Sequence, residues 1–243
     1  MTTRALPLLP LKTVLFPGSP LPLHIFEERY QVMFDHCLRQ NTPFGVALIA
    51  SGEEVGGPAV PHPVGTTARI VRWERLPDRR IKVLTVGEHR FRIVEEIESA
   101  QPYMMAAVEY WDDEAPEPDQ LPVLIESIAP TYAEYLTLIV LLANQGLPIH
   151  QFQLPDDPSR LSYHIATHLQ IDPGQKQHLL EAPGAASRLK REVTILCRER
   201  DFLQRLVSLR GIAGQDEMYW GQELCGNRAR IHPAAQKDDA SDE

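Results

Sequence analysis

Five prolines constrain how the first part of this chain can fold. They stand at positions 7, 10, 17, 20 and 22, among leucines and other apolar residues. Because each proline fixes the backbone angle φ and lacks an N–H donor, residues 6–23 cannot form a helix. We therefore predict short strands at a sheet edge, joined by a turn at Pro17-Gly18.

A helix is predicted directly after these strands. Glu27 and Glu28 fall in its first turn, where the helix dipole favours acidic side chains, and Asn41 is expected to cap its end. Apolar residues recur at helical spacing, as Phe26, Tyr30, Met33, Phe34, Cys37 and Leu38. We expect Phe16 and the two phenylalanines of this stripe to lie in the core of a β-rich domain.

The composition is that of an ordinary globular protein. With 243 residues, 43% apolar and 23% charged, the chain can form one large domain or two small ones. No stretch reaches the roughly 18 consecutive apolar residues that span a bilayer, and the proline-interrupted N-terminus does not resemble a secretory signal. Three widely spaced cysteines favour reduced thiols, so we expect a cytoplasmic protein with no membrane partner.

Short strands are expected to follow one another up to residue 111. The segments are Phe44–Ala50, Gly65–Leu76, Ile81–Val86, Phe91–Ile97 and Tyr103–Trp111, the third and fourth joined through Gly87. The Gly- and Pro-rich segment 51–63 between the first two is predicted to be a mobile loop. Tight connections of this kind favour a barrel or sandwich over residues 1–111. The acidic, proline-rich segment 112–122 is predicted to be a linker.

Helical periodicity begins after the linker, over residues 123–210. Val123–Ala143 contains Pro130, so it is either one kinked helix or two shorter ones. Asp157-Pro158 and Asp172-Pro173 are typical helix starts, with aspartate as N-cap and proline in the first turn. The longest helix is predicted over Ala185–Leu209, ending at Gly211. Residues 211–243 are expected to be a partly disordered tail.

The run PLLPLKTVLFPGSPLPLHIFEERY, from Pro7 to Tyr30, resembles the amino-terminal, substrate-binding domain of Lon proteases. The pattern IAxxLxI, KQxLLE and RL between Ile165 and Leu189 resembles its helical part, so the similarity covers about residues 5–210. The chain looks most like bacterial proteins made of that domain alone. This resemblance implies an α+β fold, with a PUA-like mixed β-barrel followed by a helical bundle. It also implies recognition of protein substrates without the ATPase and peptidase modules.

The sequence contains no convincing catalytic constellation. His164 and His168 have the i, i+4 spacing of zinc ligands, but no third ligand or general-base glutamate accompanies them. Asp112, Asp113 and Glu114 fall in the predicted linker, where carboxylates are expected to be solvated. No phosphate-binding loop and no nucleophile elbow are present. We therefore expect no catalytic residue, no metal site and no cofactor.

Binding is the remaining role, and we assign it to three residues near the first helix. Glu28 and Arg29 are expected to face solvent there, beside His24 at the end of the preceding strand. The cleft between barrel and bundle is the second candidate site. The expected partners are unfolded or exposed apolar protein segments, and a separate protease. An RNA-binding module and an uncharacterised hydrolase are the alternatives; a net charge of −9 makes nucleic acid an unlikely partner.

Overall fold

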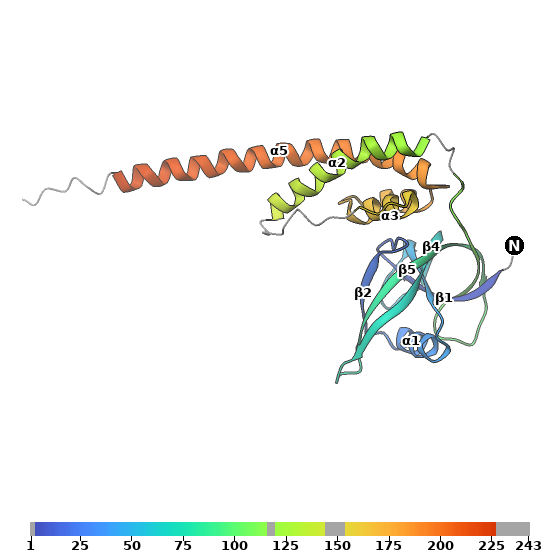
Figure 1. Cartoon of the computed structure of the whole chain (residues 1–243). Coiled ribbons are helices and arrows are strands. Elements are labelled where there is room, and N and C mark those ends of the chain that lie inside the picture. The colour runs from blue at the N-terminus through green and yellow to red at the C-terminus, as the bar shows by residue number, and fades with distance from the viewer. Residues whose placement is uncertain (1–2, 116–119, 144–153, 227–243) are drawn as a thin grey trace, which may run out of the picture.

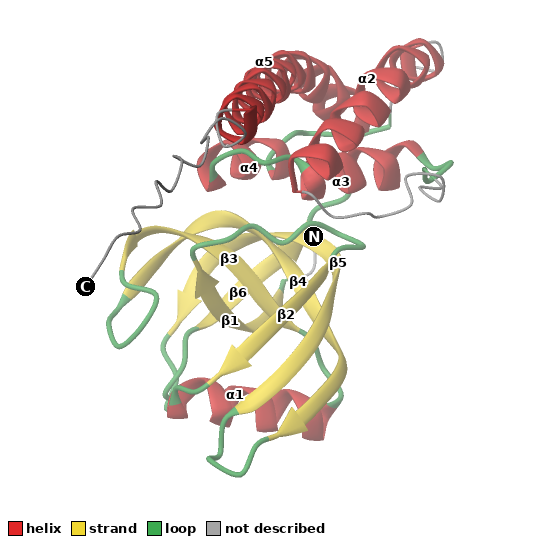
Figure 2. Cartoon of the chain, turned by 90° about the vertical axis from the view of Figure 1, so that its left-hand side faces the viewer, coloured by secondary structure: helices red, strands yellow, loops and turns green. Residues whose placement is uncertain are grey.

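The computed structural model describes residues 3–115, 120–143 and 154–226, with side chains of the last helix described up to residue 210. A β-barrel forms one half of the molecule, and four helices lie beyond one of its ends (Figure 1). A further helix, α1, lies at the opposite end of the barrel (Figure 2). The α+β class and the mixed barrel followed by helices are confirmed.

Six strands form the sheet in the order β2-β5-β4-β3-β1-β6, and an added pairing of β5 with β6 closes five of them into a ring. Among the described strands, only the β1–β3 pair is parallel; the other pairs are antiparallel. β2 lies outside the ring, against the first half of β5. The strands are Arg4–Leu11, Pro20–Ile25, Phe44–Gly52, Ala59–Arg75, Ile81–Ile97 and Met105–Tyr110, for β1 to β6.

The prediction of two edge strands is correct for β2 and wrong for β1. The first half of β1 pairs with β6 and its second half pairs with β3, so β1 lies inside the ring. Pro7 faces Met105 and Pro10 faces Ala47 in these two pairings. Each half of β1 pairs with one neighbouring strand among the described residues, so a strand with missing N–H donors is tolerated there.

Two strand boundaries also differ from the prediction. The expected loop 51–63 shrinks to residues 53–58, because β3 and β4 extend into it. The two strands expected on either side of Gly87 are one strand, β5. A register shift opposite Thr66 and Ala68 lets β5 bend instead of ending, as β-bulges do. A Cβ at Gly87 would lie 2.3 Å from the Phe16 carbonyl oxygen, so this close approach requires glycine.

Helix α1 spans Glu28–Gln40 and ends, as predicted, at Asn41 in the left-handed conformation (φ 52). It buries Tyr30, Met33, Phe34 and Cys37 against the barrel. The prediction that Phe26 belongs to the core is wrong, since its side chain is 52% exposed. Phe26 follows the buried Ile25, and the alternation of a strand turns it outward.

The helical half contains α2 (Gln120–Ala143), α3 (Pro158–His168), α4 (Pro173–Leu180) and α5 (Ala185–Gly226). Asp157 and Asp172 cap α3 and α4, accepting from the backbone N–H of residues 160 and 175 at 2.8 and 3.0 Å. α2 is one helix containing Pro130 and begins within the expected linker. Gly211 does not end α5, because a single glycine costs a helix only about 1 kcal/mol. Residues 211–226 of the tail, which is expected to be partly disordered, therefore continue α5, and residues 227–243 lie outside the described residues.

By length and composition, the stretch Leu121–Ala143 of α2 could cross a membrane, although it contains no long uninterrupted apolar run. In the structure it packs along α5 instead (Figure 1). Ile128 and Tyr132 are fully buried, and Glu134 pairs with Arg200 of α5 at 3.7 Å. These contacts favour a packed helix of the bundle over a membrane span.

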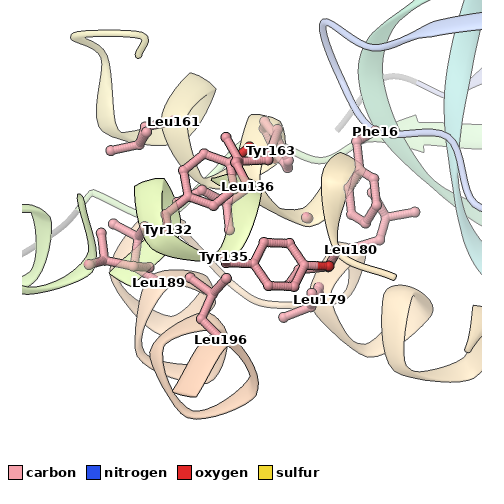
Figure 3. Close-up of a cluster of buried hydrophobic side chains, with 14 of the residues drawn as sticks. Phe16, Tyr132, Tyr135, Leu136, Leu161, Tyr163, Leu179, Leu180, Leu189 and Leu196 are labelled. Atoms are coloured by element: carbon pink, nitrogen blue, oxygen red, sulfur yellow. The ribbon is translucent and has the colours of Figure 1, made fainter. Parts of the chain in front are cut away.

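A cluster of buried side chains joins the two halves of the molecule. Its members come almost entirely from the four helices, but Phe16 enters from the loop between β1 and β2 (Figure 3). The Phe16 and Tyr163 ring centroids are 6.3 Å apart. The expectation that Phe16 serves the barrel core is therefore wrong: it is buried, but on the helical side. The Phe-Pro-Gly turn fastens the barrel to the helices.

Candidate functional site

An apolar groove of about 360 Å³ lies where β2 runs into α1. Strands β1 and β2 form its floor, and the loop 53–58 forms one wall. Its lining residues are Leu9, Leu11, Pro22, Leu23, His24, Ile25, Phe26, Glu27, Tyr30, Glu54 and Val55. Phe26 and Val55 expose 52% and 55% of their surface, so large apolar side chains meet solvent on two sides of one hollow.

Two residues at the start of α1, the N-cap Glu27 and Arg29, hold the loop wall in place. The carboxylate of Glu27 accepts a hydrogen bond from the Gly56 N–H at 3.2 Å, and Arg29 donates to the Gly57 carbonyl at 3.2 Å. Arg29 also pairs with Glu27 at 3.0 Å and lies over the Tyr30 ring, 4.5 Å from its centroid. These contacts, which we call the loop latch, fix Val55 and Glu54 relative to Phe26.

The structure places the three predicted binding residues differently. His24 is exposed and lines the groove. Arg29 does not project freely into solvent as expected, because its side chain is only 28% exposed and belongs to the loop latch. Glu28 is exposed but is not among the lining residues. Sequence reasoning missed Glu54 and Val55, since they belong to a segment interpreted only as a mobile loop.

A second cavity of about 620 Å³ occupies the predicted interdomain cleft. The Pro17-Gly18 turn and β5 lie on one side and α3 on the other, and Arg160, His164 and His168 are among its lining residues. The two histidine rings are 4.4 Å apart between centroids, and His168 Nδ1 lies 2.8 Å from the His164 carbonyl oxygen. Burial, followed by the neighbouring His168, lowers the pKa of His164.

The histidine pair does not form a metal site with other described residues. Across the described ranges 3–115, 120–143 and 154–226, no three His, Cys, Asp or Glu side chains come together in a metal-holding group. The carboxylate of Glu88, which also lines the cleft, pairs with Arg69 at 2.5 Å. The cleft therefore offers a polar cavity at the junction rather than an evident reaction centre.

Beside the cleft, the two halves are joined by a buried ionic network. Asp113 pairs with Arg90 of β5 at 2.5 Å and with Arg188 of α5 at 2.7 Å. It also accepts hydrogen bonds from Ser159 and Tyr163 of α3, at 2.8 and 2.9 Å. The expectation that Asp113 is a solvated linker residue is wrong, because its side chain is only 14% exposed between two fully buried guanidinium groups.

Comparison with known proteins assigns this architecture to a class. Residues 5–198 match the family model of the ATP-dependent protease La (Lon) substrate-binding domain. The chain therefore belongs to the family of Lon substrate-binding domains. The fold agrees with the crystal structure of a Lon N-terminal domain protein from Xanthomonas campestris, at 25% identity and a TM-score of 0.57, over 79% of this chain and 98% of that one.

Two further relatives define the extent of the similarity. The N-terminal domain of a Mycobacterium avium complex Lon protease superposes with a TM-score of 0.62 at 16% identity, over 80% of this chain and 98% of that chain, which shows the fold. A Lon protease of Brevibacillus choshinensis is 29% identical over 209 residues, or 83% of this chain and 26% of its own length. The chain thus spans about a quarter of the length of such relatives.

Proposed function

We propose that this protein is a non-catalytic module that binds exposed apolar segments of other proteins in the groove between β2, α1 and the loop 53–58. The observation that carries the proposal is the exposure of Phe26 and Val55 around a concave, apolar surface. Burying such side chains against a partner is favourable by roughly 25 cal/mol for each Å² of apolar surface removed from water.

The loop latch makes this groove suitable for recognition. A site whose walls are held by hydrogen bonds loses less conformational entropy on binding than one that must be ordered first. Glu27 and Arg29 provide those bonds to the loop wall, and β2 provides a fixed floor. His24 adds a polar group at the margin that is able to orient a bound segment.

Side chains, rather than strand addition, are proposed to provide the binding energy. β2 lies at an edge of the sheet, where another strand could in principle pair. Pro20 and Pro22 interrupt that edge, and prolines on edge strands discourage pairing because they lack N–H donors.

The family supports the same assignment. The matching family model is described as a substrate-binding domain, and the relatives are named Lon proteases. We infer from this that the bound segments belong to protein substrates and that a separate protease is a partner. We also infer a cytoplasmic location.

The test compares two phenylalanines of nearly equal exposure. Phe26→Ala removes an exposed apolar side chain from the groove lining, whereas Phe202→Ala removes a side chain of α5 from a residue that is 55% exposed. We expect Phe26→Ala to weaken binding of a chemically denatured model protein several-fold in titration calorimetry, and Phe202→Ala to leave it unchanged. Equal affinity of both variants and the parent would place binding outside the groove, and the interdomain cleft would become the next site to test.

A further inference from the structure

Resting on the proposed function, we propose that the groove selects segments in which a large apolar residue stands next to lysine or arginine. An apolar hollow alone accepts any apolar side chain of suitable size. The groove of this protein also carries negative charge that no cation in the described part of the chain matches, and charge at the margin of an apolar site discriminates among partners.

Glu54 is the main source of this charge. It lines the groove, is half-buried, and has neither a hydrogen-bond nor an ion-pair partner among the described residues. Its charge also acts on Tyr30, another residue of the groove lining. Burial raises the pKa of the Tyr30 hydroxyl; the charge of Arg29 opposes that rise, and the charges of Glu27 and Glu54 add to it.

The nearby cations are already engaged. Arg29 pairs with Glu27 in the loop latch, and Lys12 pairs with Glu53 at 3.7 Å. These pairs leave Glu54 uncompensated at the groove. Glu28, exposed in the first turn of α1, adds a second carboxylate without a partner in the described part of the chain.

Lysine at the His24 side of the groove does not cancel this negative charge. Lys82 is the cross-strand neighbour of His24, but Lys82 has Glu74 as its other cross-strand neighbour, on β4. A bound segment would therefore meet apolar surface in the hollow and negative potential at the loop wall. A cationic residue beside the apolar anchor meets attraction there, and an acidic one meets repulsion.

The experiment uses three labelled peptides with one shared apolar core and flanking residues that are lysine, glutamine or glutamate. Fluorescence anisotropy with the full chain should give the affinity order lysine, glutamine, glutamate. The dissociation constants of the lysine and glutamate peptides should differ by on the order of tenfold at low salt. A partly exposed charge pair contributes modestly, but this comparison combines the attraction of lysine with the repulsion of glutamate. Added salt should narrow the difference.

Two variants locate the charge responsible. Glu54→Gln should bring the affinity of the lysine peptide close to that of the glutamine peptide. Glu95→Gln makes the same change at an exposed carboxylate on β5, away from the groove lining, and should preserve the full order.

The outcomes separate this inference from the function on which it rests. If no peptide binds, the groove is not the site and the proposed function fails there. If all three peptides bind equally, the groove binds apolar segments and the charge selection is wrong. An affinity order that persists in Glu54→Gln would also overturn the role given to Glu54.

Discussion

Glu192 combines full burial with an ionisable side chain. It lies on α5, one turn after Arg188, with its carboxyl group enclosed by the bundle. Burial raises the pKa of Glu192 well above its ordinary range, and the charge of Arg188 only partly opposes that rise. The folded protein therefore binds a proton at this site under conditions in which the unfolded chain releases it.

The sign of the resulting pH dependence follows from that difference. The folded state binds more protons at Glu192 than the unfolded state does. The free energy of unfolding therefore falls as pH rises from the ordinary glutamate pKa towards the raised pKa of the folded state. We expect Glu192→Gln to be more stable than the parent at about pH 7 and to lose that advantage at about pH 4, in urea unfolding across this range. An advantage that is independent of pH would show that folding does not raise the pKa of Glu192.

The sequence could predict the role of a residue when its hydrogen-bond partner is close in the chain, and could not when the partner is far away. Asp157 and Asp172 were recognisable as caps because each bonds to a backbone N–H three residues ahead. The role of Asp113 was not recognisable, since Arg90 lies 23 residues before it and Arg188 lies 75 residues after it. No pattern within a linker reveals a partner at that distance.

At the scale of elements, the loop latch joins α1 to the loop between β3 and β4. Arg29→Ala removes the donor to the Gly57 carbonyl and the cation paired with Glu27. We expect amide exchange at Gly56, whose N–H donates to Glu27, to become on the order of tenfold faster, as for loss of one hydrogen bond of about 1–1.5 kcal/mol. Hydrogen exchange read by NMR measures this directly.

Glu28→Ala is the matched control on the same helical turn. Glu28 is exposed and lies outside the loop latch, so its removal should leave exchange in residues 53–58 unchanged. Faster exchange in both variants would mean that α1 as a whole is loosened. Unchanged exchange in Arg29→Ala would mean that the loop holds its position without the latch.

The sequence predicted the positions of the helices and strands better than the residues at which they end or the residues that they expose. Apolar periodicity located α1 and the strands, because it reports which residues are buried. It could not show that β5 bends through Gly87 instead of stopping, since the bend depends on the approach of the Phe16 backbone. The groove was found only in part: His24 was named, whereas Glu54 and Val55 reach it through contacts of the neighbouring Gly56 and Gly57 with α1.

At the scale of the whole molecule, we expect Asp113 to couple the unfolding of the barrel to that of the helices, because it bonds to β5, α3 and α5. Asp113→Asn removes the negative charge between the buried Arg90 and Arg188, and breaking a buried ion pair costs about 3–5 kcal/mol. We expect a lower urea midpoint and separate transitions for barrel and helices. Helix circular dichroism reports the helical transition. The fluorescence of Trp73, in a Trp111→Phe/Trp220→Phe background, reports the barrel transition, because Trp111 packs against the helical cluster whereas Trp73 contacts Phe34.

Asp112→Asn provides the control for this measurement. The residue is the exposed neighbour of Asp113, so its change should preserve the parent's midpoint and a single shared transition. Separate transitions in the parent would show that the halves are independent domains even with the network intact. A single transition in Asp113→Asn at an unchanged midpoint would show that apolar packing around Phe16 is sufficient.

The pairing of β1 with β6 has a consequence for the order of events during synthesis. Arg4 lies opposite Val108, so the ring requires a contact across about a hundred residues of chain. A ribosome-bound chain that ends before β6 has open strand edges at both β1 and β5, and such edges invite aggregation. Until Met105–Tyr110 emerges, the nascent protein displays the kind of extended apolar segment that we propose its finished groove binds in others.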